Sequence, residues 1–337
     1  MKAVCIKKPL DIGMIELPEP KCAEGEALIE IKAVSICGSD VAAYRYLHPL
    51  VKYPRIIGHE TAGIVLQIGE NKRGIKRGDR VLLEPYLSCG TCYPCSQGRT
   101  NCCESLKVLG MQTDGTMREF YAHPANLLHK IPDNIQWEHA PLAEPISIAL
   151  HSIHRVAPKK GEHVTVIGAG AIGIMAGLLA KIYGAAPIIV DVDAGRLEIA
   201  RSCGISHALN EGKENVHEKI CDITKGRMSE TVIEASGTGP GIANALRYAS
   251  YTGRIALVGW PNQEVSLNTL QITLKELEIA GSRTSLNDLP ECLELISTGK
   301  IDMSKFVNEV ISFDRLPDAV RNLADYPSRY LKIVALR

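Results

Sequence analysis

The sequence predicts an α/β protein with two domains, one rich in short β-strands and one built on a doubly wound parallel sheet. Three observations predict this class. The first ~145 residues contain short runs of alternating apolar and polar residues between glycine turns. From about residue 146, apolar strands alternate with amphipathic helices. A glycine-rich turn, GAGAIG, joins one of these strands to the helix that follows it.

The β-rich region contains three clear strand patterns. They are EALIEIKAVSIC (26–37), TAGIVLQIG (61–69) and DRVLLEPY (79–86). Each alternates apolar and polar residues like a half-buried strand, and glycines bound the second and third. Many short strands of this kind predict a barrel-like or sandwich-like β domain.

The second region begins with ISIALHSIHRVA (146–157), which predicts an amphipathic helix leading out of the β-rich region. Strand and helix patterns then alternate through HVTVIGAG, AIGIMAGLLAKIYGA, PIIVDVD, RLEIARSCG, ETVIEASG, GIANALRYAS, RIALVG and LEIAGS. Such alternation predicts a parallel sheet covered on both faces. From about Leu286, two helices (LPECLELIST and PDAVRNLAD) precede a terminal strand, YLKIVAL, which is expected to return to the first domain.

Composition excludes several classes of protein. Of 337 residues, 45% are apolar, which is enough for a substantial core, and 38 basic residues balance 38 acidic ones. No net field therefore attracts nucleic acid or an anionic membrane. The N-terminus lacks the apolar stretch of a signal peptide, and no apolar run reaches the ~20 residues of a membrane span. A cytoplasmic protein with reduced thiols is expected.

The GAGAIG turn predicts a dinucleotide site. Gly168 permits the tight turn, Gly170 lets the backbone approach a pyrophosphate, and Gly173 lets helix and strand pack closely. The next strand runs into Asp191, eighteen residues beyond Gly173, where a carboxylate can bind both ribose hydroxyls and repel a 2′-phosphate. The alternative is a packing turn followed by a capping aspartate. The expected cofactor residues are Gly168, Gly170, Ile172, Gly173, Asp191 and Arg196.

A dense cysteine segment, CGTCYPCSQGRTNCC, predicts a closed metal site. Cys89, Cys92, Cys95 and Cys103 are spaced C-x2-C-x2-C-x7-C, and four thiolates without an open position are typical of structural zinc. An iron–sulfur cluster is the rival. Cys102 adjoins Cys103 and is an alternative fourth ligand or a spare buried thiol.

A second set of metal-binding residue types is scattered along the β-rich region. Cys37 lies in ICGSD, His59 and Glu60 in IIGHE, and Glu144 in LAEP. A thiolate, an imidazole and one or two carboxylates suit a catalytic zinc with one open position. Cys37 and Glu144 would already neutralise the dication, so Glu60 and Glu144 are expected to compete with water for it.

Together these motifs resemble the zinc-dependent medium-chain alcohol dehydrogenases along essentially the whole chain. The matching segments are GHE, the cysteine loop, GDRV, AEP, GAGAIG and LKIV. Glu144 in the third-ligand position resembles the sorbitol and threonine dehydrogenase branch. GRTNCCESLKVLGMQTDGTMREF (98–120) resembles bacterial enzymes that oxidise L-galactonate or L-gulonate at C5. The resemblance implies a GroES-like domain (1–145 and 286–337), an inserted Rossmann domain (146–285), NAD, two zinc ions and a homodimer or homotetramer.

The resemblance also implies roles for single residues. Ser39 is expected to take the substrate proton, with Glu60 near the metal, and Arg283 falls where polyol dehydrogenases carry an arginine in the substrate cleft. One departure is Ala42, which stands where many relatives have a proton-relay histidine. The proton must then leave through water, through the ribose, or through a group such as Tyr44 or His48.

The expected function is therefore oxidation of a secondary hydroxyl of a sugar acid to a ketone, with NAD+ accepting the hydride. Arg283 is the first candidate for binding the substrate carboxylate because a guanidinium can contact both oxygens. Weaker candidates are Arg45, His48 and Arg118. The alternatives are a polyol or L-threonine dehydrogenase, a non-catalytic NAD-binding sensor, and a nucleic-acid-binding zinc module. Intact metal ligands disfavour the sensor, and the neutral charge disfavours the nucleic-acid module.

Overall fold

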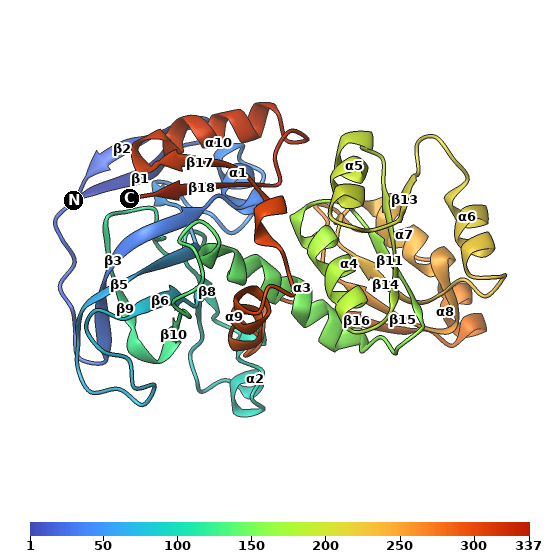
Figure 1. Cartoon of the computed structure of the whole chain (residues 1–337), viewed down its shortest axis with the longest axis horizontal. Helices are drawn as coiled ribbons and strands as arrows, with labels where there is room; N and C mark the ends of the chain where they lie inside the picture. The colour runs from blue at the N-terminus through green and yellow to red at the C-terminus, as the bar shows by residue number, and fades with distance from the viewer. The chain divides into compact units, whose positions relative to one another are not determined.

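The chain divides into two compact units, and the computed structural model describes all 337 residues. Unit 1 comprises Met1–Glu144 and Leu289–Arg337, and unit 2 comprises Pro145–Asp288 (Figure 1). The chain therefore passes from one unit to the other twice. The first passage follows residue 144, where the sequence placed it after 145, and the second follows residue 288, where the sequence placed it after 285.

Unit 1 is built on a seven-stranded sheet of order β10-β6-β5-β3-β18-β17, with β9 also paired to β3. A three-stranded sheet of order β2-β1-β4 and a two-stranded ribbon of β7 and β8 accompany it. The strands are β1 (Lys2–Lys8), β2 (Asp11–Glu16), β3 (Glu26–Ser35), β4 (Arg55–Ile56), β5 (Glu60–Ile68), β6 (Arg80–Leu83), β7 (Tyr86–Leu87), β8 (Lys107–Val108), β9 (Phe120–Pro124), β10 (Leu128–Lys130), β17 (Val307–Ser312) and β18 (Lys332–Leu336).

Short helices connect the strands of unit 1. They are α1 (Gly38–Tyr44), α2 (Tyr93–Ser96), α9 (Leu289–Ser297), α10 (Leu316–Asp325) and the 3-10 turns η1 (Thr100–Cys102), η2 (Ala125–Leu127), η3 (Ala140–Leu142), η4 (Met303–Lys305) and η5 (Phe313–Arg315). The buried side of α10, with Leu316, Val320 and Leu323, packs into the same core as Ile29 and Ile31 of β3. Residues from both ends of the chain therefore share one hydrophobic core.

The terminal strand closes the main sheet of unit 1. β18 pairs antiparallel with β3 and parallel with β17, as the expected return of YLKIVAL requires. Ala335 lies opposite Val34, and both are buried. The first 144 residues thus complete their sheet only by pairing with the last six.

Unit 2 contains one parallel sheet of six strands and the helices that cover it. The elements are α3 (Ala143–Val156), whose first two residues belong to unit 1, β11 (His163–Ile167), α4 (Ala171–Ile182), β12 (Ala186–Asp191), α5 (Ala194–Ser202), β13 (His207–Asn210), α6 (Val216–Ile223), β14 (Ser229–Glu234), α7 (Gly239–Tyr248), β15 (Ala249–Leu257), α8 (Thr269–Lys275) and β16 (Glu278–Gly281).

The order of this sheet is β13-β12-β11-β14-β15-β16, and every neighbouring pair is parallel. The chain builds outward from β11 to β13 and then resumes on the other side of β11 with β14. Right-handed crossovers place α4 and α5 on one face and α6 and α7 on the other, as Figure 1 shows. The reversal between β11 and β14 is the switch point at which such sheets bind ligands.

One predicted strand is wrong in its extent. DRVLLEPY was expected to be continuous, but β6 ends at Leu83 and a separate β7 begins at Tyr86. Pro85 lies between them and has no N–H to donate to a strand partner. The short strands β1, β2 and β13 and the helix α6 were not identified in the sequence.

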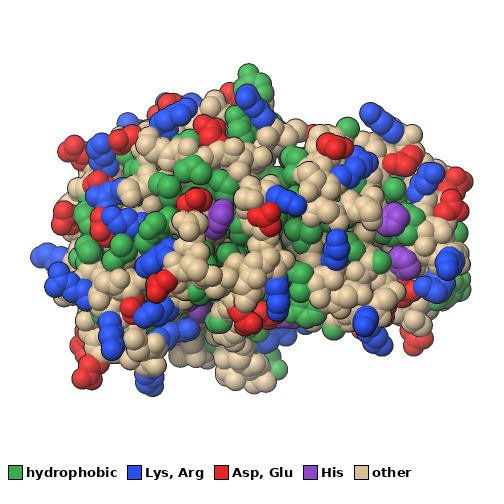
Figure 2. Space-filling view, in the orientation of Figure 1, with side chains coloured by type: hydrophobic (Ala, Val, Ile, Leu, Met, Phe, Trp, Pro, Cys, Tyr) green, Lys and Arg blue, Asp and Glu red, His purple; other side chains and the backbone are tan.

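The surface of the face seen in Figure 2 mixes basic and acidic side chains without a large patch of one sign. This agrees with the equal numbers of acidic and basic residues in the chain. None of the helices combines the length and apolar character needed to cross a membrane.

His123 of β9 predicts a specific acid sensitivity. The ring is fully buried opposite Ala27 of β3, neither ring nitrogen has a hydrogen-bond partner of good geometry, and burial lowers its pKa from 6.5 to about 4. Folding therefore favours the neutral ring. The resulting stability is complete above pH 6.5 and is lost as the pH falls towards 4, by about 3 kcal/mol. Urea denaturation should show that the free energy of unfolding falls less between pH 7 and pH 4.5 in His123→Phe than in the wild type.

His207→Phe is the matched control because His207 lies exposed at the start of β13. In His207→Phe the free energy of unfolding should fall between pH 7 and pH 4.5 by as much as in the wild type. Equal pH dependence of wild type and His123→Phe would show that His123 does not carry this effect.

Candidate catalytic, metal and nucleotide sites

Three of the predicted ligands converge in unit 1. The ligand atoms of Cys37, His59 and Glu60 all lie within 4.8 Å of one another. Cys37 is the N-cap of α1, and Glu60 is the first residue of β5, directly after His59. The approach to His59 needs glycine at position 58: its φ is +97°, and a Cβ there would lie 2.6 Å from the Met117 side chain. The chain is thus bent to bring the imidazole beside the thiol.

Asp40 orients this cluster, although the sequence analysis did not identify it. Its buried carboxylate accepts hydrogen bonds from the amides of Cys37 and Gly58, each at 3.0 Å. One oxygen also lies 3.8 Å from Nδ1 of His59. This separation is longer than a hydrogen bond, and Nδ1 has no hydrogen-bond partner, so Asp40 acts on the ring through its charge while Nε2 lies on the side of Ser39. The only sequence signal was its position three residues after Cys37, where acidic residues cap helices.

The pKa values of the cluster show a concentration of negative groups. Burial acts to lower the pKa of His59, but Cys37 and Asp40 outweigh it and raise the pKa well above 6.5. Such a donor set, with thiol, imidazole and carboxylates buried together, fits a divalent cation. His59 would then be a neutral ligand, since a metal replaces the proton.

Glu144 lies near the cluster but outside the 4.8 Å set. It occupies the first turn of α3, is buried, and accepts a short hydrogen bond from the hydroxyl of Tyr86. Burial and the neighbouring Glu60 raise the pKa of Glu144 to about 6, while His59 and the Tyr86 hydroxyl act in the opposite direction. Tyr86 is a second partner that the sequence analysis missed.

Lys332 of β18 is the most important residue that the sequence analysis missed. Its ammonium forms an ion pair with Glu60, and both side chains are buried, with 4% and 0% of their surface exposed. Burial alone would raise the pKa of Glu60, but Lys332 reverses this and lowers it. Glu60 is therefore ionised and already neutralised. The available signal was a lysine within the apolar strand pattern YLKIVAL.

Ser39 lies beside the Cys37–His59–Glu60 cluster. Its hydroxyl is 3.4 Å from Nε2 of His59, in the first turn of α1. His48 is partly buried, and both burial and the proximity of His59 lower its pKa. Tyr44 packs on the core of unit 1, and Ala42 is partly buried in the same helix.

The arginines proposed for substrate binding differ in their surroundings. Arg45 donates to the carbonyl of Ala324, and Arg118 donates to the carbonyl of Gly115 at 2.9 Å and lies over the ring of Tyr121 at 5.2 Å. These contacts occupy both side chains within unit 1. Arg283 belongs to unit 2, where it lies partly buried in the segment after β16.

The cysteine loop gathers its four predicted ligands around one point. The sulfur atoms of Cys89, Cys92, Cys95 and Cys103 all lie within 4.8 Å of one another, and Cys102 is not in the set. The Cys92 and Cys103 sulfurs are 3.8 Å apart. A tetrahedral ion with Zn–S bonds of about 2.3 Å separates its sulfurs by about 3.8 Å. The loop therefore fits zinc.

The backbone of this loop prepares the thiols for a cation. The amides of Thr91 and Cys92 lower the pKa of Cys89 to about 5, whereas desolvation and the neighbouring thiols raise that of Cys95 to about 12. Without a cation, Cys89 and Cys95 therefore do not ionise together. All eleven cysteines of the chain are free thiols, so no disulfide competes for these sulfurs.

The nucleotide motif has the expected local geometry in unit 2. Gly168 has φ of +103°, and a Cβ on Gly173 would lie 1.8 Å from the carbonyl oxygen of Gly168. Gly170 is the N-cap of α4 without a side-chain cap, and a Cβ there would meet no protein atom within 4 Å. The helix N-terminus is thus open for a phosphate group. The motif lies at the end of β11, beside the switch point.

Asp191 ends the neighbouring strand β12. Its two carboxylate oxygens accept the amides of Ala169 at 2.6 Å and Asp193 at 2.8 Å, so the group is fixed next to the glycine turn. Arg196, whose amide bonds to Asp193 at 3.1 Å, lies partly buried in the first turn of α5. Ile172 is partly buried in the first turn of α4.

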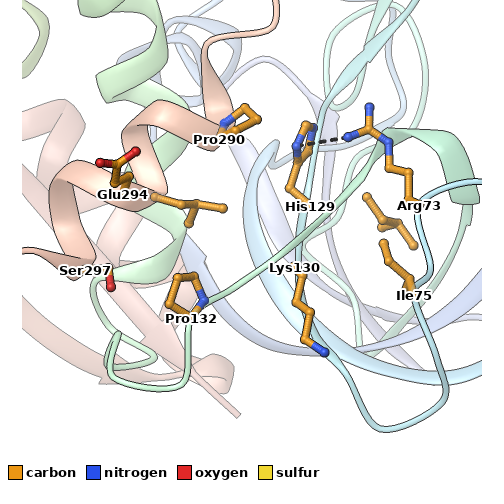
Figure 3. A pocket seen from close by; sticks show the side chains of 10 residues that line it. Arg73, Ile75, His129, Lys130, Pro132, Pro290, Glu294 and Ser297 are labelled. Atoms are coloured by element: carbon orange, nitrogen blue, oxygen red, sulfur yellow. Dashed lines mark hydrogen bonds between the residues drawn. The ribbon is translucent and has the colours of Figure 1, made fainter.

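A separate surface pocket of about 520 Å³ lies in unit 1 between the Arg73–Ile75 turn, β10 and α9 (Figure 3). Nδ1 of His129 lies 3.4 Å from Nη1 of Arg73, and Nε2 of the same ring lies 2.8 Å from Oε2 of Glu84. No predicted site residue lines this pocket, so it is not the catalytic site. Its lining is Arg73, Ile75, Leu128, His129, Lys130, Pro132, Pro290, Leu293, Glu294 and Ser297.

Comparison with known proteins identifies the family of the chain. Residues 23–133 match the alcohol dehydrogenase GroES-like domain, and residues 171–298 match the zinc-binding dehydrogenase family. The chain is 51% identical to an uncharacterised zinc-type alcohol dehydrogenase-like protein of Haemophilus influenzae, and the match covers 100% of this chain and 98% of that one. It is 33% identical to sorbitol dehydrogenase of Bacillus subtilis, covering 99% of this chain and 96% of that one.

A solved structure has the same fold over the whole chain. An alcohol dehydrogenase of Escherichia coli CFT073, in complex with NADH, superposes with a TM-score of 0.94 and 32% identity, covering 100% of this chain and 99% of that one.

The cysteine loop predicts different outcomes for two adjacent thiols. Cys92→Ser removes one of four converging sulfurs, so elemental analysis should find one zinc per chain in place of two, and the protein should melt at a lower temperature. Cys102→Ser is the matched control and should retain both ions. Iron with inorganic sulfide in the wild type, or loss of zinc from Cys102→Ser, would contradict the assignment.

The Lys332–Glu60 pair predicts a strong coupling in the metal-free protein. Lys332→Met leaves a buried carboxylate unpaired, which should lower the free energy of unfolding by about 3–5 kcal/mol. Glu60→Gln together with Lys332→Met should lower it much less. Urea denaturation of both single variants and the double variant measures the coupling.

Lys130→Met is the control for this cycle, because the Lys130 side chain is 63% exposed in its ion pair with Asp79. Its loss should change the free energy of unfolding by less than about 1 kcal/mol. Additive effects of the Glu60 and Lys332 substitutions would show that the buried pair is not energetically coupled.

Proposed function

The chain belongs to the zinc-binding, medium-chain alcohol dehydrogenases, and we propose that it oxidises a secondary hydroxyl of a sugar acid to a ketone with NAD+ as hydride acceptor. The observation that carries the reaction type is the convergence of Cys37, His59 and Glu60 on one buried point, with the hydroxyl of Ser39 beside it. Thiolate, imidazole and carboxylate together suit a catalytic zinc. A neighbouring hydroxyl suits proton transfer.

Two zinc ions per chain are proposed. Cys37, His59 and Glu144 would hold the catalytic ion, with Glu60 as an exchanging ligand, and the four-cysteine loop would hold the structural ion. The catalytic zinc supplies Lewis acidity, which lowers the pKa of a bound hydroxyl. The raised pKa of Glu144 and the ion pair of Glu60 support exchange between the two carboxylates, because each has an alternative partner inside the protein.

The side chains of unit 1 then handle the proton. Ser39 accepts the proton of the substrate hydroxyl, while the charge of Asp40 acts on the imidazole of His59. Lys332 balances the charge of Glu60, so the carboxylate does not reduce the electrophilicity of the site. With Ala42 in place of a relay histidine, the proton leaves by water, the ribose, or a group such as Tyr44 or His48.

Unit 2 would hold the nicotinamide cofactor, which would supply the hydride acceptor for the oxidation. NAD rather than NADP is proposed because the Asp191 carboxylate is fixed at the end of β12, beside the glycine turn. A carboxylate at this position accepts hydrogen bonds from ribose hydroxyls and repels a 2′-phosphate. Arg196 and Ile172 are further proposed cofactor contacts.

The substrate class rests on two features of the sequence. The segment Gly98–Phe120 resembles enzymes that act on L-galactonate or L-gulonate, and Arg283 offers a guanidinium for the carboxylate. Similarity to sorbitol dehydrogenase supports a neutral polyol as the second candidate, and L-threonine is the third. We also propose a cytoplasmic homo-oligomer that acts in sugar-acid metabolism; free thiols support the reducing compartment.

A substrate panel tests this function. Aldonates, neutral hexitols and threonine are each supplied with NAD+ or NADP+, and reduced cofactor is followed by absorbance. The kcat/KM should be highest for L-galactonate or L-gulonate with NAD+. Arg283→Ala should cost the aldonate roughly 2–5 kcal/mol of transition-state binding and a neutral polyol much less.

The outcomes separate the parts of the proposal. If sorbitol or threonine exceeds every aldonate, the substrate assignment is wrong although the dehydrogenase reaction stands. Equal loss on both substrates in Arg283→Ala would exclude the carboxylate contact. A preference for NADP+ would contradict the role of Asp191.

A further inference from the structure

The segment that carries Arg283 is held in an unusual conformation. Residues 282–288 connect β16 to α9 without helix or strand structure. Thr284 and Asn287 have φ of +49° and +59°, in the left-handed region that non-glycine residues rarely adopt. Such a conformation persists only where the surroundings fix it. Ser282 and Ser285 are correspondingly buried.

The last turns of α3 hold both ends of this segment. At its start, Nε of Arg155 donates to the carbonyl of Gly281 at 3.0 Å. At its end, the carboxylate of Asp288 lies 2.9 Å from Nδ1 of His154 and 3.4 Å from Nδ1 of His151. One helix therefore anchors both sides of the loop that contains Arg283.

Asp288 is the centre of this arrangement. Only 4% of its surface is exposed, and its carboxylate also accepts the amide of Leu286 at 2.7 Å. Burial alone would raise the pKa of Asp288, but hydrogen bonds from His151 and His154 lower it to about 2. The group is thus a fixed anion with a histidine on each oxygen.

Tyr183 completes the contacts of His154. Its hydroxyl lies 3.3 Å from Nε2 of that ring. With Nδ1–H donating to Asp288, Nε2 is left to accept the tyrosine hydroxyl, so both ring nitrogens have defined roles. This network restrains the ring and, through it, the end of the segment.

We propose that Asp288, held by His151 and His154 of α3, is a positioning residue that fixes Arg283 for recognition of the substrate carboxylate. The inference rests on the proposed function of Arg283. A guanidinium binds two carboxylate oxygens only when its fork is held within narrow angular limits. A loop tied at both ends to one helix provides this restraint, whereas an untethered connection of the same length is mobile.

Kinetics on two substrate classes test the proposal. Asp288→Asn replaces one oxygen by an N–H donor that meets a histidine N–H, so the network breaks while the side-chain shape is kept. The kcat/KM for the aldonate should fall at least roughly tenfold, mainly through KM, while a neutral polyol changes less than about twofold. In an Arg283→Ala background, Asp288→Asn should have no further effect. Asp302→Asn is the control, because Asp302 caps the amide of Ser304 at 3.1 Å on the surface of unit 1.

Conservative replacement at His154 adds a second readout. The side-chain amide of asparagine places an N–H near the position of Nδ1, so His154→Asn should retain aldonate kinetics that His154→Leu loses. Equal behaviour of the two variants, or equal losses on aldonate and polyol in Asp288→Asn, would overturn the proposal.

Hydrogen exchange gives a measurement that is independent of the substrate. Backbone amides of residues 282–288 should exchange faster in Asp288→Asn and His154→Leu than in the wild type and in His154→Asn. Unchanged exchange overturns the positioning role whatever the substrate is. If the wild type oxidises no aldonate, the proposed function fails, and the exchange data alone decide whether Asp288 holds this segment.

Discussion

The buried ion pair between Glu60 and Lys332 joins the two ends of the chain at the metal cluster. The partners are 272 residues apart, and both side chains are buried. An unpaired charge at either position would be costly, so the pair constrains how β5 and β18 are placed in the sheet. Pairing of β18 with β3 meets this constraint, because it brings Lys332 to the strand that lies beside β5. Pairing of β18 therefore both completes the sheet and places the charge that neutralises Glu60.

The two metal clusters solve the same electrostatic problem in different ways. In the cysteine loop, backbone amides lower the pKa of Cys89, while desolvation and nearby sulfurs raise that of Cys95. Around Cys37, protein groups already offset much of the charge, through Lys332 on Glu60 and the Tyr86 hydroxyl on Glu144. The first arrangement favours permanent retention of an ion. The second contains carboxylates that already have partners within the protein, which agrees with the carboxylate exchange proposed above.

The sequence predicted most where the signal was local. The cysteine spacing, the glycine turn and Asp191 lie within short segments whose geometry is set by nearby residues. Asp40, Tyr86 and Lys332 escaped prediction because their importance depends on partners distant in the chain. At Pro85 the prediction failed although the cause was local. Hydrophobic alternation predicted a continuous strand, but the proline backbone interrupts it. Short elements such as β13, with four residues, carry too little periodicity to identify.

The split of unit 1 has a consequence for biosynthesis. Unit 2 is encoded without interruption, so its sheet and nucleotide motif are complete in the growing chain before any residue beyond Asp288 is made. Unit 1 must wait for β18, which begins at Lys332, five residues before the C-terminal Arg337. During translation, Cys37, His59 and Glu60 are thus synthesised early and remain without Lys332 until β18 is made. A nascent chain that has not yet reached β18 would therefore contain a complete unit 2 beside a unit 1 in which Glu60 still lacks its buried partner.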